Sequence, residues 1–198
     1  MSHQFVSDVL SNPNNAHILS RWDELCLPDG WLVAGCLFQT VWNRISNQAS
    51  DAGIKDYDIF YYDPTDLSAE AEQAVQQRAQ GLFSDLGITL ELCNQARVHQ
   101  WYEAHFGHPY PRLYSARQGI DRFLMPSTCV GINPLEVYAP HGFDALYAGL
   151  LFMNPLTPHR VLYEQKALSY QQRWPWLRCV EQASAASLGI YTKDVSGR

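Results

Sequence analysis

The chain has 198 residues, of which 46% are hydrophobic and 17% are charged, and its formal net charge is -6. These fractions are typical of a globular protein and exclude an intrinsically disordered chain. The acidic balance argues against a protein that mainly grips the phosphate backbone of nucleic acid, because such proteins need a basic surface. We therefore do not expect nucleic acid as the partner.

Cysteine usage and the hydrophobic pattern indicate a cytoplasmic protein. The five cysteines are scattered and form no Cys-x-x-Cys pair, so neither a zinc ribbon nor a disulfide framework is indicated. Residues 1–4 lack a basic region followed by an apolar run, and we expect no signal peptide. No stretch approaches the roughly 20 apolar residues of a membrane span.

The first signal along the chain is a strand followed by a glycine and a helix. We expect one or two helices over residues 4–27, and the apolar run 31–34 then predicts a strand buried on both faces. Gly35 follows, and the spacing of Leu37, Val41 and Ile45 predicts an amphipathic helix. The free N–H groups at such a helix start form a natural phosphate site. A tight turn without any ligand remains the alternative.

Residues 55–64 predict a second strand that carries two aspartates. Its centre is aromatic and β-branched, and Pro64 would end it. Since side chains on a strand alternate between faces, Asp56 and Asp58 project from the same side of the sheet. Carboxylates held side by side repel each other, and proteins usually place them so for a divalent cation or a shared proton. The alternative is a solvent-facing pair at a strand end.

A third carboxylate follows on the next predicted strand. Ser68 suits the N-cap of a helix that runs to about residue 86, and residues 88–92 then alternate with period two. If this strand pairs with the aspartate strand, Glu91 joins Asp56 and Asp58 on the open face, although an ordinary outward-facing glutamate is the competing interpretation.

The rest of the chain predicts further short elements. A helix carries Trp101, Tyr102 and Phe106, whose rings we interpret as core, with a base-stacking platform as the second interpretation. We expect a hairpin over 128–138, a helix near 146–151, and two helices over 162–173 and 177–185, with a loosely ordered tail from 189. There is no internal repeat or clear linker.

Several motifs together resemble the nucleotidyltransferase superfamily that includes polymerase-β-like enzymes. Closer still is the resemblance to a small bacterial nucleotidyltransferase-like family of unknown substrate. The segments that carry it lie within roughly residues 20–155: Ala34-Gly35-Cys36 with Val41-Trp42-Asn43, Asp56-Tyr57-Asp58 through Tyr62-Asp63, Asn94-Gln95-Ala96-Arg97-Val98-His99, Thr128–Gly131 and Ala139–Asp144.

The resemblance implies an α+β fold, with a nucleotidyltransferase-like mixed β-sheet flanked by helices and additional helices at the C-terminus. We expect a single domain over 1–198, with a core at about 17–155 and a helical C-terminal extension at 156–198.

The resemblance also implies an active-site cleft that holds Mg²⁺ (or Mn²⁺) and a nucleoside triphosphate. Asp56, Asp58 and Glu91 would be the catalytic and metal-binding carboxylates, and Gly35 would lie at the phosphate-binding helix start. The further candidate nucleotide contacts are Cys36, Gln39, Asn43 and Arg97. The wider superfamily usually has serine at the position of Cys36, and cysteine is a weaker hydrogen-bond donor. Arg97 would either neutralise phosphate charge or pair with a carboxylate such as Glu91.

The activity expected is metal-dependent transfer of a nucleoside monophosphate from the triphosphate to an unidentified acceptor, either a small molecule or a protein. One alternative is a catalytically inactive nucleotide-binding sensor, which Cys36 favours. The other is a metal-dependent phosphohydrolase, for which water alone is the acceptor.

Overall fold

The computed structural model describes residues 1–181 and contains a five-stranded mixed sheet of order β3-β2-β1-β4-β5. β2 and β3 run parallel to each other, and the other neighbouring strands are antiparallel. The strands are β1 (Trp31–Val33), β2 (Asp56–Tyr61), β3 (Thr89–Asn94), β4 (Gly131–Ile132) and β5 (Val137–Tyr138). A separate parallel pair consists of β6 (Leu150–Leu151) and β7 (Arg178–Cys179).

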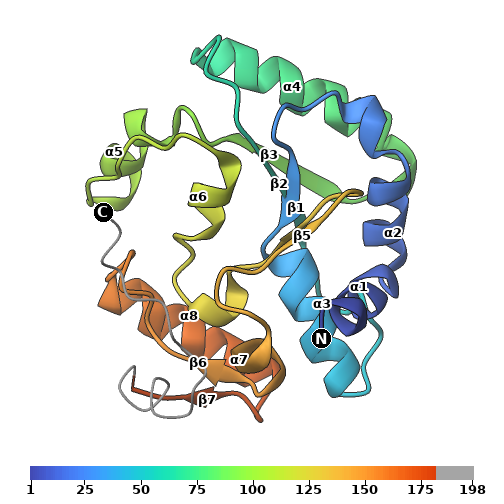
Figure 1. Cartoon of the computed structure of the whole chain (residues 1–198), viewed down its shortest axis with the longest axis vertical. Coiled ribbons are helices and arrows are strands. Elements are labelled where there is room, and N and C mark those ends of the chain that lie inside the picture. Colours follow the sequence, from blue (N-terminus) through green and yellow to red (C-terminus); the bar gives the residue numbers. More distant parts are fainter. Residues whose placement is uncertain (182–198) are drawn as a thin grey trace.

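Helices cover both faces of the sheet (Figure 1). In chain order they are α1 (Ser2–Leu10), α2 (Pro13–Ser20), α3 (Gly35–Ile45), α4 (Ala69–Leu82), α5 (Tyr102–Phe106), α6 (Ala116–Ile120), α7 (Asp144–Tyr147) and α8 (Arg160–Arg173). Short 3₁₀ turns lie at Trp22–Leu25, Ser84–Leu86, Val98–Gln100 and Pro126–Thr128. None of the helices described is long and apolar enough to cross a membrane.

The main core lies between the sheet and helices α1 to α4. Tyr57, Ile59 and Tyr61 on β2 are buried there, together with Leu90 and Leu92 on β3. Burying one such aliphatic side chain contributes about 1.5–3 kcal/mol. Because side chains alternate, the residues between these buried positions project to the opposite face of the sheet, toward α6 and α8 (Figure 1).

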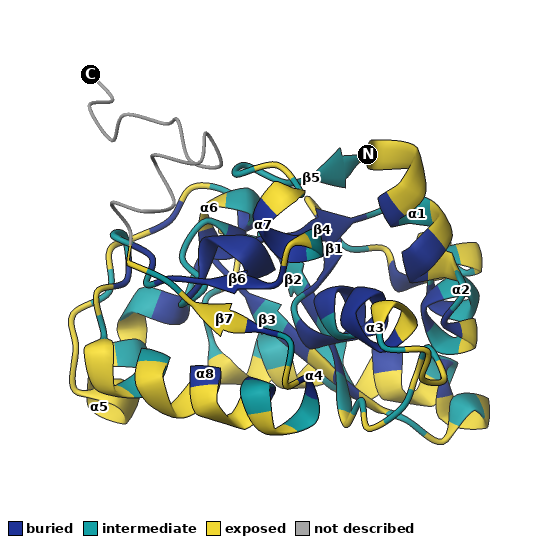
Figure 2. Ribbon diagram, turned by 90° about the horizontal axis from the view of Figure 1, so that it is seen from below, coloured by how far each residue is buried: buried dark blue, intermediate teal, exposed yellow. Residues whose placement is uncertain are grey.

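Helix α8 is held against α3 by aromatic rings and by an arginine. Trp42 on α3 packs edge-on against Trp174, with 5.2 Å between the ring centroids. Arg173 donates one hydrogen bond to the Gln39 side-chain oxygen and another to the Ala52 carbonyl, at 2.9 Å. The outer side of α8 stays exposed (Figure 2). These contacts place the inner side of α8 over the open face of the sheet.

Most of the elements expected from the sequence are present. The strand–glycine–helix unit, the aspartate strand, the helix after Ser68, the Glu91 strand, the hairpin and the helix over 162–173 are all confirmed. Ser68 caps α4 by accepting a hydrogen bond from the Ala71 N–H at 3.2 Å.

Two of the expected helices are wrong in the residues described. The helix near 146–151 ends at Tyr147, because Gly149 adopts φ 64 and leads into β6. A Cβ at Gly149 would lie 2.2 Å from the Trp176 ring, so this turn requires a residue that has no side chain. At the start of the expected 177–185 helix, residues 178–179 form β7. The remainder of that helix and the tail from 189 lie outside the described residues, as does the part of the C-terminal extension beyond residue 181.

Candidate active site

Asp56, Asp58 and Glu91 line one cavity of about 350 Å³ on the open face of the sheet. Asp58 and Glu91 are direct partners across the parallel pair β2–β3, and Asp56 lies two residues before Asp58 on the same face. The central geometric expectation from the sequence is therefore met: the three carboxylates meet in one hollow.

The Asp58 carboxyl group is largely buried, and this changes its titration. Burial raises its pKa from 3.8 to about 7, and the charges of Asp56 and Glu91 add to this effect, while Lys166 opposes it. Within residues 1–181, no side chain or backbone group forms a hydrogen bond or salt bridge with any of the three carboxylates. An acidic group that is buried without a partner is costly, and a bound cation would remove much of that cost.

The described part of the chain contains no group of three or more His, Cys, Asp or Glu side chains that could hold a metal ion by itself. This does not conflict with a magnesium site, since Mg²⁺ is usually bound through one or two carboxylates and completes its shell with water and substrate phosphates. The residues therefore fit a cation that arrives with a nucleotide better than one held permanently by the protein.

The start of α3 lies at the edge of the same cavity. Gly35 lines it, and no side chain caps this helix start. Ala34, just before the helix, adopts φ 59 and ψ −137, a conformation that residues other than glycine rarely take. Backbone strain of this kind costs about 1–3 kcal/mol and is concentrated at functional sites.

Of the other candidates on α3, Gln39 lines the cavity, but the side chains of Cys36 and Asn43 do not. The Cys36 thiol is buried and donates to the Val33 carbonyl at 3.2 Å, and burial raises its pKa. The Asn43 side chain donates to the Ala52 carbonyl and accepts from the Trp174 indole, each at 3.0 Å. Cys36 can thus offer a ligand only its backbone N–H, and Asn43 joins α3 to its neighbours.

Arg97 lies outside the cavity and pairs with a carboxylate. From the sequence, Arg97 was expected either to bind a phosphate or to pair with an acidic side chain such as Glu91. In the structure it forms a salt bridge with an acidic side chain, which is Glu72 on α4. Its guanidinium also donates to the Leu67 carbonyl at 3.2 Å, and Glu72 accepts the Asn94 N–H at 2.8 Å. These bonds hold α4 against the end of β3.

The residues that close the cavity on its other side were not predicted from the sequence. Lys166 and Tyr170 come from α8, more than 70 residues after Glu91, and Phe123, Met125 and Thr128 come from the segment after α6. Leu162, Lys166 and Tyr170 recur every four residues and so share one face of a helix. That spacing was visible in the sequence, but nothing local indicated which surface the face would cover.

The arrangement of sheet, helices and acidic cavity is that of a nucleotidyltransferase fold. An NMR structure described as revealing a CCA-adding enzyme head domain is similar to this chain, with a TM-score of 0.76 and 22% sequence identity. The match covers 92% of this chain and 97% of that chain, and at this identity it establishes the fold alone. The family model described as nucleotidyltransferase matches residues 20–179, and the chain belongs to that family. No curated protein matches the chain.

Proposed function

We propose that this protein transfers a nucleoside monophosphate from a nucleoside triphosphate to an acceptor, either a small molecule or a protein, with Asp56, Asp58 and Glu91 as its catalytic carboxylates. The observation that carries the proposal is that all three line one cavity beside the uncapped start of α3, in a chain that belongs to a nucleotidyltransferase family. We also keep the cytoplasm as the proposed location, because all five cysteines are free thiols.

The triphosphate would bind at the start of α3. The positive end of the helix dipole and the backbone N–H groups of Gly35 and Cys36 attract phosphate oxygens, and the missing Cβ of Gly35 allows a close approach. A Cβ there would lie 2.5 Å from the Gln39 side-chain nitrogen, so glycine is also needed for Gln39 to keep its place.

Asp56 and Asp58 would hold Mg²⁺ or Mn²⁺ together with phosphate oxygens and water. When bound, the cation neutralises phosphate charge and lowers the pKa of the attacking hydroxyl. Glu91, next to Asp58 in the sheet register, would accept a hydrogen bond from that hydroxyl and orient its oxygen toward the α-phosphorus. Lys166 would add a positive charge at the wall of the cavity. Positioning and charge neutralisation are the main sources of catalysis in phosphoryl transfer.

The first test is thermal unfolding with each nucleoside triphosphate, with and without Mg²⁺. A metal-dependent rise in Tm is expected for the wild-type protein and for Asp51→Asn, an exposed control on the loop before β2, but not for Asp58→Asn. The absence of any shift with all four triphosphates would contradict the proposal.

The second test is release of labelled pyrophosphate from a γ-³²P-labelled triphosphate in the presence of candidate acceptors. Pyrophosphate release that depends on an acceptor and falls at least about a hundredfold in Asp58→Asn supports transfer. Binding without any turnover would instead identify a nucleotide sensor. Release of phosphate or nucleotide with water as the only acceptor would identify a phosphohydrolase.

A further inference from the structure

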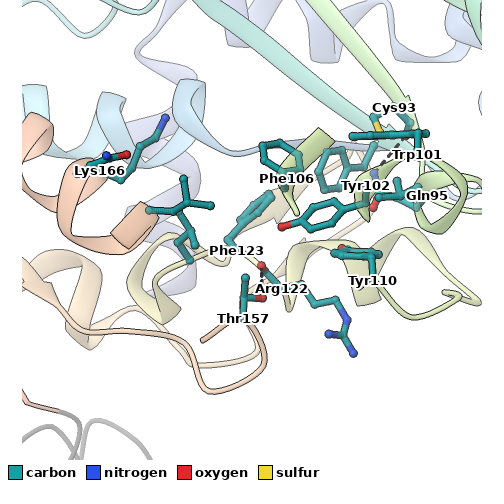
Figure 3. Close-up of a pocket in the computed structure, with 16 residues that line it drawn as sticks. Cys93, Gln95, Trp101, Tyr102, Phe106, Tyr110, Arg122, Phe123, Thr157 and Lys166 are labelled. Atoms are coloured by element: carbon teal, nitrogen blue, oxygen red, sulfur yellow. Dashed lines mark hydrogen bonds between the residues drawn. The ribbon is translucent and has the colours of Figure 1, made fainter. Parts of the chain in front are cut away.

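A second cavity of about 490 Å³ opens beside the acidic one, and its wall is largely aromatic. The rings that line it belong to Phe60, Trp101, Tyr102, Phe106, Tyr110 and Phe123. Figure 3 shows the Trp101, Tyr102 and Phe106 rings grouped together, and the Tyr110 ring packs next to that of Tyr102. The rings after β3, interpreted from the sequence first as core and second as a stacking platform, therefore form the wall of a pocket.

The rings pack against one another and together form a continuous aromatic wall beside the open space of the cavity. The Tyr102 ring lies 4.3 Å from that of Tyr110 and 4.6 Å from that of Phe106, measured between centroids. Phe106 remains 40% exposed at the rim, where a ligand could cover it. Flat aromatic surfaces of this kind gain most from a planar ligand that stacks on or against them.

The two cavities are neighbours along the same strands. Phe60 follows Asp58 by two residues on β2, and Cys93 follows Glu91 by two residues on β3, so each projects from the same face as its acidic neighbour. Phe123, Leu124 and Lys166 line both cavities. The two cavities are therefore adjacent and share part of their wall.

The sheet register also orders the two cavities along a line. β1 pairs antiparallel with β2, with Trp31 opposite Phe60 and Val33 opposite Asp58, so the chain leaves β1 toward Asp56 and starts α3 there. The start of α3 and the aromatic cavity therefore lie on opposite sides of Asp58. In phosphoryl transfer the attacking and leaving oxygens stand in line on opposite sides of the phosphorus. With the leaving pyrophosphate at the start of α3, the attacking oxygen must come from the aromatic side.

We propose that the aromatic cavity is the acceptor site, and that the acceptor is a small, planar aromatic alcohol or phenol that is neutral or anionic. This inference rests on the proposed function for its in-line argument. Among residues 1–181, the charged residues that line the cavity are Arg122 and Lys166, both basic, and no aspartate or glutamate of this range lines it, so a cationic acceptor finds no counter-charge in this part of the wall. The transfer joins the acceptor oxygen to the α-phosphorus, breaks the bond to pyrophosphate and releases the hydroxyl proton to solvent.

The test measures binding of three probes by ligand-observed NMR: 4-hydroxybenzyl alcohol, its saturated analogue 4-(hydroxymethyl)cyclohexanol, and tyramine. The aromatic alcohol is expected to bind, and the other two at least about tenfold more weakly. Leu162→Trp, which fills the cavity from α8, is expected to abolish this binding. Leu168→Trp is the matched control, because Leu168 lies on the same helix, is 58% exposed and lines neither cavity.

Binding of α,β-methylene-ATP with Mg²⁺ is measured on the same variants and is expected to be unchanged in Leu162→Trp. If that variant loses the nucleotide analogue, the cavity holds the nucleobase and the acceptor assignment is overturned. The acceptor assignment is also overturned if the aromatic alcohol does not bind, or binds no better than its saturated analogue or tyramine. It is likewise overturned if binding of the aromatic alcohol is retained in Leu162→Trp. If wild-type protein binds the aromatic probe but no nucleotide, the proposed function fails while the ligand class of the cavity stands.

Discussion

Asp58 and Glu91 face each other across the parallel strands β2 and β3, as direct partners in the sheet register. They come from strands separated by the whole of α4, and neither has a hydrogen-bond or salt-bridge partner in the part of the chain that is described. Two acidic groups fixed this way on rigid strands repel each other and favour a cation between them. The arrangement costs stability, and this cost can be measured.

Stability in the absence of divalent metal is expected to fall as pH rises from about 4 to about 7. The raised pKa of Asp58, about 7 in the folded protein against 3.8 ordinarily, means that the folded state holds a proton in this range that the unfolded chain has released. The folded state is therefore favoured at low pH and loses this advantage as the proton leaves. Urea unfolding in EDTA across this range measures the slope.

Asp58→Asn removes that titration and is expected to be more stable than wild type at pH 8 by about 1–3 kcal/mol. Asp51→Asn, at an exposed loop position, is expected to keep the wild-type slope. If the free energy of unfolding depends on pH equally in wild type and in Asp58→Asn, the pKa of Asp58 is not raised in the folded protein.

Ala34→Gly is expected to stabilise the protein by about 1 kcal/mol, because Ala34 has φ 59 and glycine adopts this conformation without strain. For a chain of this size the change corresponds to a rise in Tm of about 2–4 °C. The measurement is calorimetric unfolding. Ala104→Gly on α5, where the backbone is helical, is expected to shift Tm in the other direction. A lower Tm for Ala34→Gly would mean that the turn is not strained.

Arg173 and Gln39 are expected to be energetically coupled, because their hydrogen bond joins α8 to α3 at the wall of the acidic cavity. A double-mutant cycle with Arg173→Ala and Gln39→Ala should give a coupling energy of about 1–2 kcal/mol in urea unfolding. The control cycle uses Arg160 and Glu164, an exposed pair on the same helix, for which about 0.5 kcal/mol or less is expected. Similar coupling energies in the two cycles would contradict a hydrogen bond between Arg173 and Gln39.

Arg97→Met is expected to destabilise the protein by about 2–3 kcal/mol, because it leaves the partly buried Glu72 carboxylate without its partner. Affinity for α,β-methylene-ATP with Mg²⁺ should not change, since Arg97 lines neither cavity. Arg160→Met is the exposed control for stability, with an expected change within about 0.5 kcal/mol. A tenfold or greater loss of nucleotide affinity in Arg97→Met would instead support the phosphate-binding alternative.

The sequence by itself determined the local units of this protein. Alternation along residues 56–61 put Asp56 and Asp58 on one face of β2, and alternation along 89–94 put Glu91 on one face of β3. The apolar run before Gly35 predicted the turn into α3. Such patterns depend on neighbours a few residues apart, so they can be interpreted without any tertiary contact. The motifs also carried the resemblance that the family match confirms.

Only the tertiary structure decided what covers that face. Lys166 and Tyr170 reach the acidic cavity because Arg173 and Trp174 fasten α8 to α3, and both contacts span more than 130 residues. Arg97 met Glu72 rather than Glu91 for the same reason, since packing of α4 on β3 chose its partner. The rings near residue 101 became a cavity wall instead of core because Leu162, Gln165 and Lys166 of α8 line the same cavity without filling it. Long-range packing selects among partners that the local sequence makes equally available, and local patterns carry no information about that choice.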